Sequence, residues 1–169
     1  MWTVCSFSSY SIFNQLKYVE GHVITNAYYT YGSDLLACVF GGYMYLSIDV
    51  KATFACAYFC SFVGVFYVFW IDHTDDVQRQ NIITGLLLLT KFGITCAFLT
   101  TYQTSFHTNI FPQSYRASAI GVCNIIARTV TLLAPTMNDL QKPTPLILMM
   151  GAAAIGLISS FFINDKSIR

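Results

Sequence analysis

Long apolar stretches alternate with short polar segments along the whole chain. Most of these stretches approach or exceed the ~20 residues that an α-helix needs to cross a bilayer, and the N-terminal one is shorter. The pattern predicts a single six-helix domain over residues 1–169, with both termini on the same side of a membrane. The expected helices cover residues 2–18, 24–46, 52–71, 82–107, 114–135 and 145–163.

The composition supports a membrane location. Apolar residues make up 55% of the chain and charged residues 10%, whereas about 25% of residues are charged in a typical soluble domain. Because so few charges cannot cover a soluble surface, the sequence predicts an all-α integral membrane protein whose first partner is the lipid bilayer. The net charge of +1 and the absence of a basic run predict that nucleic acid is not a partner.

The residues that could bind a metal or catalyse a reaction lack the spacing that such a site requires. The six cysteines fall in apolar segments without zinc-type spacing, and small packing residues explain them. The polar segment 72–81 holds one histidine and three aspartates, but an arginine accompanies them, so a solvated loop explains it better than a metal site. We find no nucleophile–base pair or phosphate-binding loop in the sequence. We therefore expect no enzyme activity, cofactor or metal.

The stretch from residue 111 to residue 135 is the most distinctive part of the chain. Pro112 suits the first turn of a helix or the loop before it, since it has no backbone N–H. Arg116 lies at the start of the apolar stretch, and Arg128 lies about three turns deeper. A charge near the bilayer centre costs about 2.5–3.5 kcal/mol on insertion scales, so it usually has a partner or a wet cavity. Gly121 and Pro135 complete the pattern.

This pattern, Phe-Pro-x-x-x-Arg followed by Gly121, Arg128 and Ala-Pro, resembles the eleventh transmembrane helix of organic-ion transporters of the major facilitator superfamily. The segment Lys91-Phe92-Gly93-Ile94 resembles the tenth helix of the same family. The resemblance covers residues 85–163 well and residues 1–84 through the hydropathy pattern alone. It implies that the chain forms helices seven to twelve, which is half of a major-facilitator-type bundle.

Three charged residues inside the expected helices are candidate site residues: Asp34, Lys91 and Arg128. Asp34 is either a carboxylate bonded to a neighbouring tyrosine or one that lines a cavity. The resemblance implies that Arg128 stands where organic-anion carriers have an arginine, and that Lys91 matches a basic position common in the family. The implied substrate is a small organic anion, because a guanidinium suits carboxylates. In the alternative, Arg128 pairs with Asp34 or with backbone carbonyls and only holds helices together.

The sequence departs from the family in ways that bear on transport. The family's gating loop, Asp-Arg-x-Gly-Arg-Arg, is reduced here to Asp49 and Lys51. Asn109 replaces the acidic residue usually found just before Phe-Pro, and Val130-Thr131 stands where the family tends to have glycines. The reduced loop removes part of the conformational switch that the resemblance implies, and all three departures favour a chain that does not transport.

Three hypotheses follow about function. In the first, which we favour, the chain is a transporter-derived half-bundle that serves as a structural, non-transporting subunit of a larger membrane complex. In the second, it is one half of a split or dimeric carrier for small organic anions, and a complementary transporter half is its partner. In the third, it is part of a longer gene product. A recruited subunit would suit the mitochondrial inner membrane, and the plasma membrane is the alternative.

Overall fold

The computed structural model describes residues 1–17, 23–71, 79–107, 112–138 and 144–163, and within these ranges the regular structure is entirely α-helical. Each helix follows from a stretch in which apolar residues and small hydroxyl residues dominate. The helices are α1 (Trp2–Lys17), α2 (Val23–Ser47), α3 (Val50–Ile71), α4 (Arg79–His107), α5 (Arg116–Thr131), α6 (Leu133–Asn138) and α7 (Thr144–Phe161).

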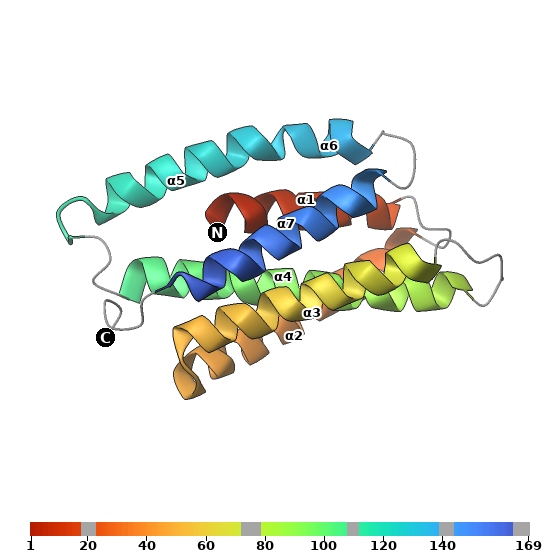
Figure 1. Ribbon diagram of the computed structural model, residues 1–169, viewed down its shortest axis with the longest axis horizontal. Coiled ribbons are helices and arrows are strands. Elements are labelled where there is room, and N and C mark those ends of the chain that lie inside the picture. Colours follow the sequence, from red (N-terminus) through yellow and green to blue (C-terminus); the bar gives the residue numbers. More distant parts are fainter. Residues whose placement is uncertain (18–22, 72–78, 108–111, 139–143, 164–169) are drawn as a thin grey trace.

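The helices lie side by side along one axis and successive helices run in opposite directions, with α5 and α6 continuing one another (Figure 1). As a result, the start of α1 and the end of α7 lie at the same end of the bundle (Figure 1). This alternation is the arrangement that short polar connections between membrane helices favour.

The helix bounds differ from the expected ones most clearly near the C-terminal end of α5. The expected single helix 114–135 begins at Arg116, and it is interrupted at Leu132 before α6 starts at Leu133. The physical reason is Pro135, which has no N–H to donate to the carbonyl of Thr131. Elsewhere, α4 begins at Arg79 rather than at residue 82, and α7 ends at Phe161 rather than at residue 163.

Four segments of the described chain are long and apolar enough to cross a membrane. They are Val50–Ile71, Ile82–Phe106, Arg116–Thr136 and Thr144–Phe161. The 16-residue α1 is shorter than these segments, and the 25-residue α2 is long enough but carries Asp34 and several tyrosine, serine and threonine residues. Together with the composition, these four segments indicate an integral membrane protein.

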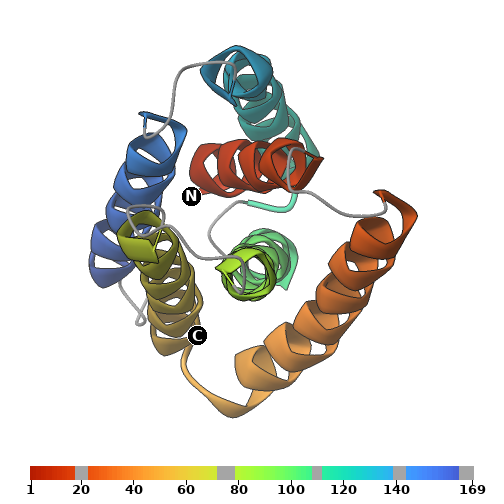
Figure 2. The same ribbon diagram turned by 90° about the vertical axis from the view of Figure 1, so that its right-hand side faces the viewer.

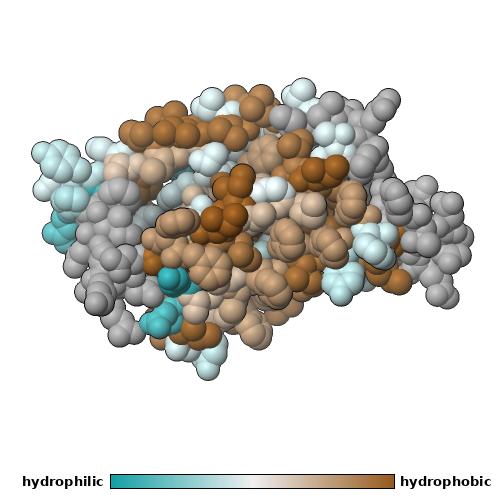
Figure 3. Space-filling model, viewed as in Figure 1, coloured by the Kyte–Doolittle hydropathy of each residue, from teal (hydrophilic) through white to brown (hydrophobic). Residues whose placement is uncertain are grey.

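Helices α1 and α4 occupy the middle of the bundle (Figure 2). Helices α3 and α7 pack against one side of them, and α5 and α2 flank the other side, where they lie apart (Figure 2). One buried cluster joins α1, α3, α4 and α7 through Ile12, Val65, Ile94 and Met149. Apolar side chains also dominate the outer surface seen in Figure 3, as expected where lipid rather than water is the solvent.

The contact between α3 and α4 is the closest in the bundle, because small residues let the two backbones approach. Ser61 donates a hydrogen bond to the carbonyl of Thr90 at 3.0 Å. A Cβ atom added at Gly93 would lie 2.6 Å from the carbonyl oxygen of Ala57 and 2.9 Å from the backbone nitrogen of Ser61. A glycine is therefore required at this point, as in other closely packed membrane helices.

Four hydroxyl residues of α4, namely Thr90, Thr100, Thr101 and Ser105, are compatible with an apolar surrounding because they donate to carbonyls of their own helix. Thr90 donates to the carbonyl of Leu86 at 2.9 Å, and Thr101 donates to that of Ala97 at 2.8 Å. This pattern satisfies a polar side chain without water or a partner helix. It explains how a membrane helix can contain so many threonines.

We predict that Gly93→Ala destabilises the bundle by about 1–3 kcal/mol, since the methyl group would press on the backbone of α3. Gly85→Ala is the matched control, because Gly85 lies on the same helix and an added Cβ there would meet nothing within 4 Å. The measurement is unfolding of the chain in lipid bicelles by titration with sodium dodecyl sulfate. Equal stability of the two variants would contradict the close α3–α4 contact.

Candidate functional site

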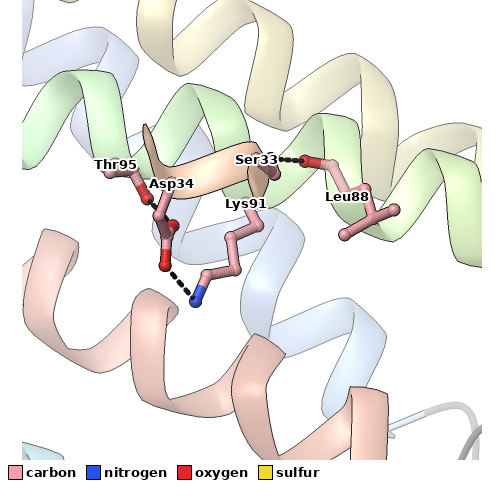
Figure 4. Close-up of polar contacts among 5 residues, drawn as sticks. All are labelled: Ser33, Asp34, Leu88, Lys91 and Thr95. Atoms are coloured by element: carbon pink, nitrogen blue, oxygen red, sulfur yellow. Dashed lines mark hydrogen bonds and ion pairs between the residues drawn. The ribbon is translucent and has the colours of Figure 1, made fainter. Parts of the chain in front are cut away.

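Asp34 and Lys91 form an ion pair that joins α2 to α4 (Figure 4). The Lys91 Nζ atom lies 3.1 Å from Oδ2 of Asp34, and the hydroxyl of Thr95 donates a 2.8 Å hydrogen bond to Oδ1. Thr95 follows Lys91 by one helical turn, so both residues of α4 reach the same carboxylate. One turn of α2 is thus held to α4 through both oxygens of Asp34.

The ion pair lies within the apolar part of the bundle. Lys91 is 6% exposed, and its ammonium group also lies 5.6 Å from the centre of the Phe13 ring on α1. An ammonium in this position needs a counter-ion, because removing a charge from water costs several kcal/mol. Asp34 provides that counter-ion, and the Phe13 ring adds a cation–π contact.

Arg128 lies on α5 and contacts α1 instead. It donates a hydrogen bond from Nη1 to the hydroxyl of Tyr10, and its guanidinium carbon lies 5.6 Å from the centre of the same ring. Tyr10 and Phe13 are separated by one helical turn and therefore share a face of α1. Both aromatic rings are only half-buried, and Arg128 is exposed.

These contacts form a continuous line across four helices, from Asp34 on α2 through Lys91 on α4 and Phe13 and Tyr10 on α1 to Arg128 on α5. We call these five residues the charged row. We call the surface formed by α2, α4, α1 and α5 opposite α3 and α7 the open face (Figure 2). The charged row links these four helices, and Lys91 is buried beneath the open face whereas Arg128 is exposed.

The structure corrects two expectations about Asp34. The alternative in which Arg128 pairs with Asp34 is wrong, because the carboxylate pairs with Lys91 and the guanidinium contacts Tyr10. The expected bond from Asp34 to a tyrosine is also wrong, since the hydroxyl comes from Thr95. The reason is the packing of the bundle, which brings α2 against α4 and keeps it apart from α5 (Figure 2).

A shallow cavity of about 660 Å³ lies elsewhere between α2 and α4. Its walls are apolar and include Leu36, Leu88 and Phe92, while Gly32 and Gly85 widen it. Neither Asp34 nor Lys91 lines it. The cavity is therefore separate from the charged row.

The predicted motif residues at the start of α5 lie where their chemistry requires. Pro112 lies in the turn before the helix, and its carbonyl accepts a 3.0 Å hydrogen bond from the Tyr115 backbone N–H. Arg116 is the first residue of α5, and it donates a 2.7 Å hydrogen bond to the carbonyl of Phe106 on α4. Arg116 therefore links α5 to α4, in addition to its expected place at the end of a membrane helix.

The other motif residues lie away from the charged row. Asp49 precedes α3, and its carbonyl accepts bonds from the backbone N–H and the hydroxyl of Thr53, while Lys51 lies in the first turn of α3. Gly121 is exposed on α5, and an added Cβ would meet nothing within 4 Å. Pro135 lies in α6, just after the interruption of the helix.

Sequence reasoning missed Thr95, Tyr10 and Phe13. Each lies at a helical spacing from another residue of the charged row, and that spacing becomes informative once the neighbouring helices are known. Thr95 lies four residues after Lys91, on the same side of α4, and the two aromatic residues lie three apart on α1. What the sequence does not show is that these two helices are neighbours in the middle of the bundle.

Comparison with known proteins gives a partial likeness to transporters. The chain is 34% identical over 82 residues to mouse solute carrier family 22 member 4, a match that covers 46% of this chain and 14% of the relative. It is 40% identical over 60 residues to the uncharacterised protein F23F12.3 of Caenorhabditis elegans, covering 33% of this chain and 12% of that protein. No family model matches the chain. The matches cover only a small part of each relative, and they indicate a transporter-related sequence.

We predict that Lys91→Met destabilises the bundle by about 3 kcal/mol, because it leaves the Asp34 carboxylate without its counter-ion. Adding Asp34→Asn should restore part of that loss, since the uncompensated charge is removed. Lys51→Met is the control, with an expected change of less than about 0.5 kcal/mol at a helix end. Titration with sodium dodecyl sulfate in lipid bicelles measures the free energies of unfolding of the wild-type chain, these three variants and the Asp34→Asn single variant. Strictly additive effects at residues 34 and 91 would contradict the ion pair.

Proposed function

We propose that this chain is a transporter-type half-bundle whose open face packs against a complementary set of membrane helices, where it serves as a structural subunit. The observation that carries the proposal is the charged row. The row ends in the exposed guanidinium of Arg128, a charge that is unsuited to contact with lipid. In transporters made of two helical repeats, substrate and coupling-ion sites lie at the interface between the repeats.

The internal pairing of Lys91 supports the structural role. The ammonium group of Lys91 is buried and already neutralised by Asp34, so this pair serves to hold α2 on α4. The reduced loop at Asp49 and Lys51 supports the same conclusion, because the fuller charged loop belongs to the conformational switch of the transporters that the chain resembles. In this proposal, the chain packs as half of such a bundle without the full gating loop.

The proposal includes six membrane crossings, with α1 and α2 as spans in addition to the four apolar segments. Inside an assembly, the short α1 and the polar α2 would be covered by protein rather than lipid, which relaxes the requirement for hydropathy. Glu20→Cys, in the segment between α1 and α2, and Ser167→Cys should then react with a membrane-impermeant thiol reagent from opposite sides, with the wild-type chain as background. Labelling from the same side would contradict the six crossings.

The absence of a carboxylate beside Arg128, among the described residues, favours a second candidate function. Within the described residues, Arg128 contacts Tyr10 and has no carboxylate partner, so its guanidinium is available to an anion. In this alternative, the chain is one half of a carrier for small organic anions, and the open face is one wall of the substrate cavity. The partial match to a solute carrier supports this candidate as well.

We predict that the isolated chain self-associates or aggregates in detergent, because the open face lacks its covering surface. Native mass spectrometry after mild extraction from the source membrane should show the chain together with other membrane proteins. A monodisperse and thermally stable monomer from both preparations would refute the half-bundle proposal.

Uptake by reconstituted vesicles separates the two candidate functions. We expect no saturable uptake of organic anions by vesicles that contain the extracted wild-type assembly. If uptake does occur, Arg128→Lys should reduce it at least tenfold while assembly persists, since lysine keeps the charge but loses the two-pronged contact. Such a result would replace the structural role with that of a carrier half.

A further inference from the structure

Arg128 cannot be neutralised from within the described helices. The chain has eight acidic residues, and Asp34 is the one that lies inside a described helix. Both oxygens of that carboxylate are already bound, one by Lys91 and the other by Thr95. The counter-ion of Arg128 must therefore come from outside this set of helices.

A second copy of the chain meets the same difficulty. The acidic residue that a second copy would offer within its described helices is again Asp34, and releasing it would leave the buried Lys91 without a counter-ion. The free energy lost with the Asp34–Lys91 pair would offset the free energy gained from a new pair between Asp34 and Arg128. Both the ammonium and the guanidinium group need a counter-ion in an apolar surrounding. A copy of the same chain is thus a poor partner for Arg128.

The side chains that flank Arg128 indicate the shape of its partner. Gly121, Ile125, Arg128 and Leu132 follow one another at spacings of four, three and four residues, which places them on one stripe of α5. All four are exposed, and an added Cβ at Gly121 would meet nothing within 4 Å. Apolar residues at this spacing with a glycine for close approach form a surface that fits another helix.

We propose that a membrane helix of a different protein docks on this stripe and presents a carboxylate to Arg128. This inference rests on the proposed half-bundle and names the chemistry of its partner. The contact with Tyr10 holds the guanidinium in place before the partner arrives, which lowers the entropy cost of forming the new pair. Ile125 and Leu132 supply the apolar contact on either side of the charge pair.

The test uses the full chain in lipid vesicles and leucine-based transmembrane peptides of ~20 residues. The peptides carry Asp, Leu or Lys at the central position, and association is measured by energy transfer between fluorescent labels. We expect the Asp peptide to associate with the wild-type chain about tenfold more strongly than the Leu peptide. Arg128→Leu should abolish this difference, and Arg128→Glu should transfer the preference to the Lys peptide.

The packing part of the proposal has its own matched variants. Gly121→Leu should weaken association of the Asp peptide several-fold, because the larger side chain blocks close approach. Gly151→Leu is the control, since Gly151 is also exposed and surrounded by open space but lies on α7, away from the stripe. Equal effects of the two substitutions would overturn the assignment of the stripe.

Other outcomes would also overturn the proposal. Equal association of the Asp and Leu peptides, or association that survives Arg128→Leu, would remove the carboxylate from the interface. Self-association of the wild-type chain that Asp34→Asn abolishes would assign the face to a second copy. Saturable binding of benzoate to the chain alone, lost in Arg128→Leu, would assign Arg128 to a free anion.

The failure of this inference can be told apart from failure of the proposed function. If the native assembly is extracted intact from wild-type membranes and equally well from those expressing Arg128→Leu, the half-bundle proposal stands and the carboxylate partner is excluded. If the wild-type chain is extracted as a stable monomer, the half-bundle proposal fails and the inference fails with it.

Discussion

A charge inside a bundle of apolar helices must be neutralised, and this constraint explains most of what distinguishes the molecule. The ion pair of Asp34 and Lys91 meets it within the chain, with Thr95 on the second carboxylate oxygen and the Phe13 ring beside the ammonium group. The pair adds a polar contact to the apolar packing of α2 on α4, where Ala37 is fully buried and the Phe40 and Phe92 rings lie edge to face. Loss of either partner would leave the other charge without its counter-ion.

The two sides of the bundle are built on different principles. On one side, α3 meets α4 at Gly93 and Ser61, and α7 meets α3 at Gly156, where an added Cβ would lie 2.4 Å from the Tyr58 ring. These contacts combine close backbone approach with the Ser61 hydrogen bond, and they hold α3, α4 and α7 together. On the other side, polar and aromatic residues of α1, α2, α4 and α5 form the charged row, with Arg128 exposed. A closely packed side and an open charged side are what a half-bundle requires if its function depends on a complementary surface.

The partial likeness to solute carriers fits this arrangement without deciding the function. A wall of a transport cavity and a docking surface for a neighbouring helix use the same physical means, namely a charge held in place on an otherwise apolar face. They differ in what neutralises Arg128. A mobile anion would leave the face periodically open, whereas a carboxylate on a partner helix would keep it permanently covered.

The sequence by itself determined that the chain is helical, that its helices are apolar enough for a membrane, and that Asp34, Lys91 and Arg128 are the charges that need an explanation. These properties depend on local composition and on the spacing of residues along one helix, so they can be read without knowing which helices are neighbours. The interruption before Pro135 was not expected from the sequence, although its cause is local, because Pro135 lacks the N–H that would bond to the carbonyl of Thr131. The tertiary structure decided the pairing of the charges. Asp34 and Arg128 have opposite signs and suggested a pair, but α2 packs on α4 and α5 packs on α1, so Asp34 meets Lys91 and Arg128 meets Tyr10.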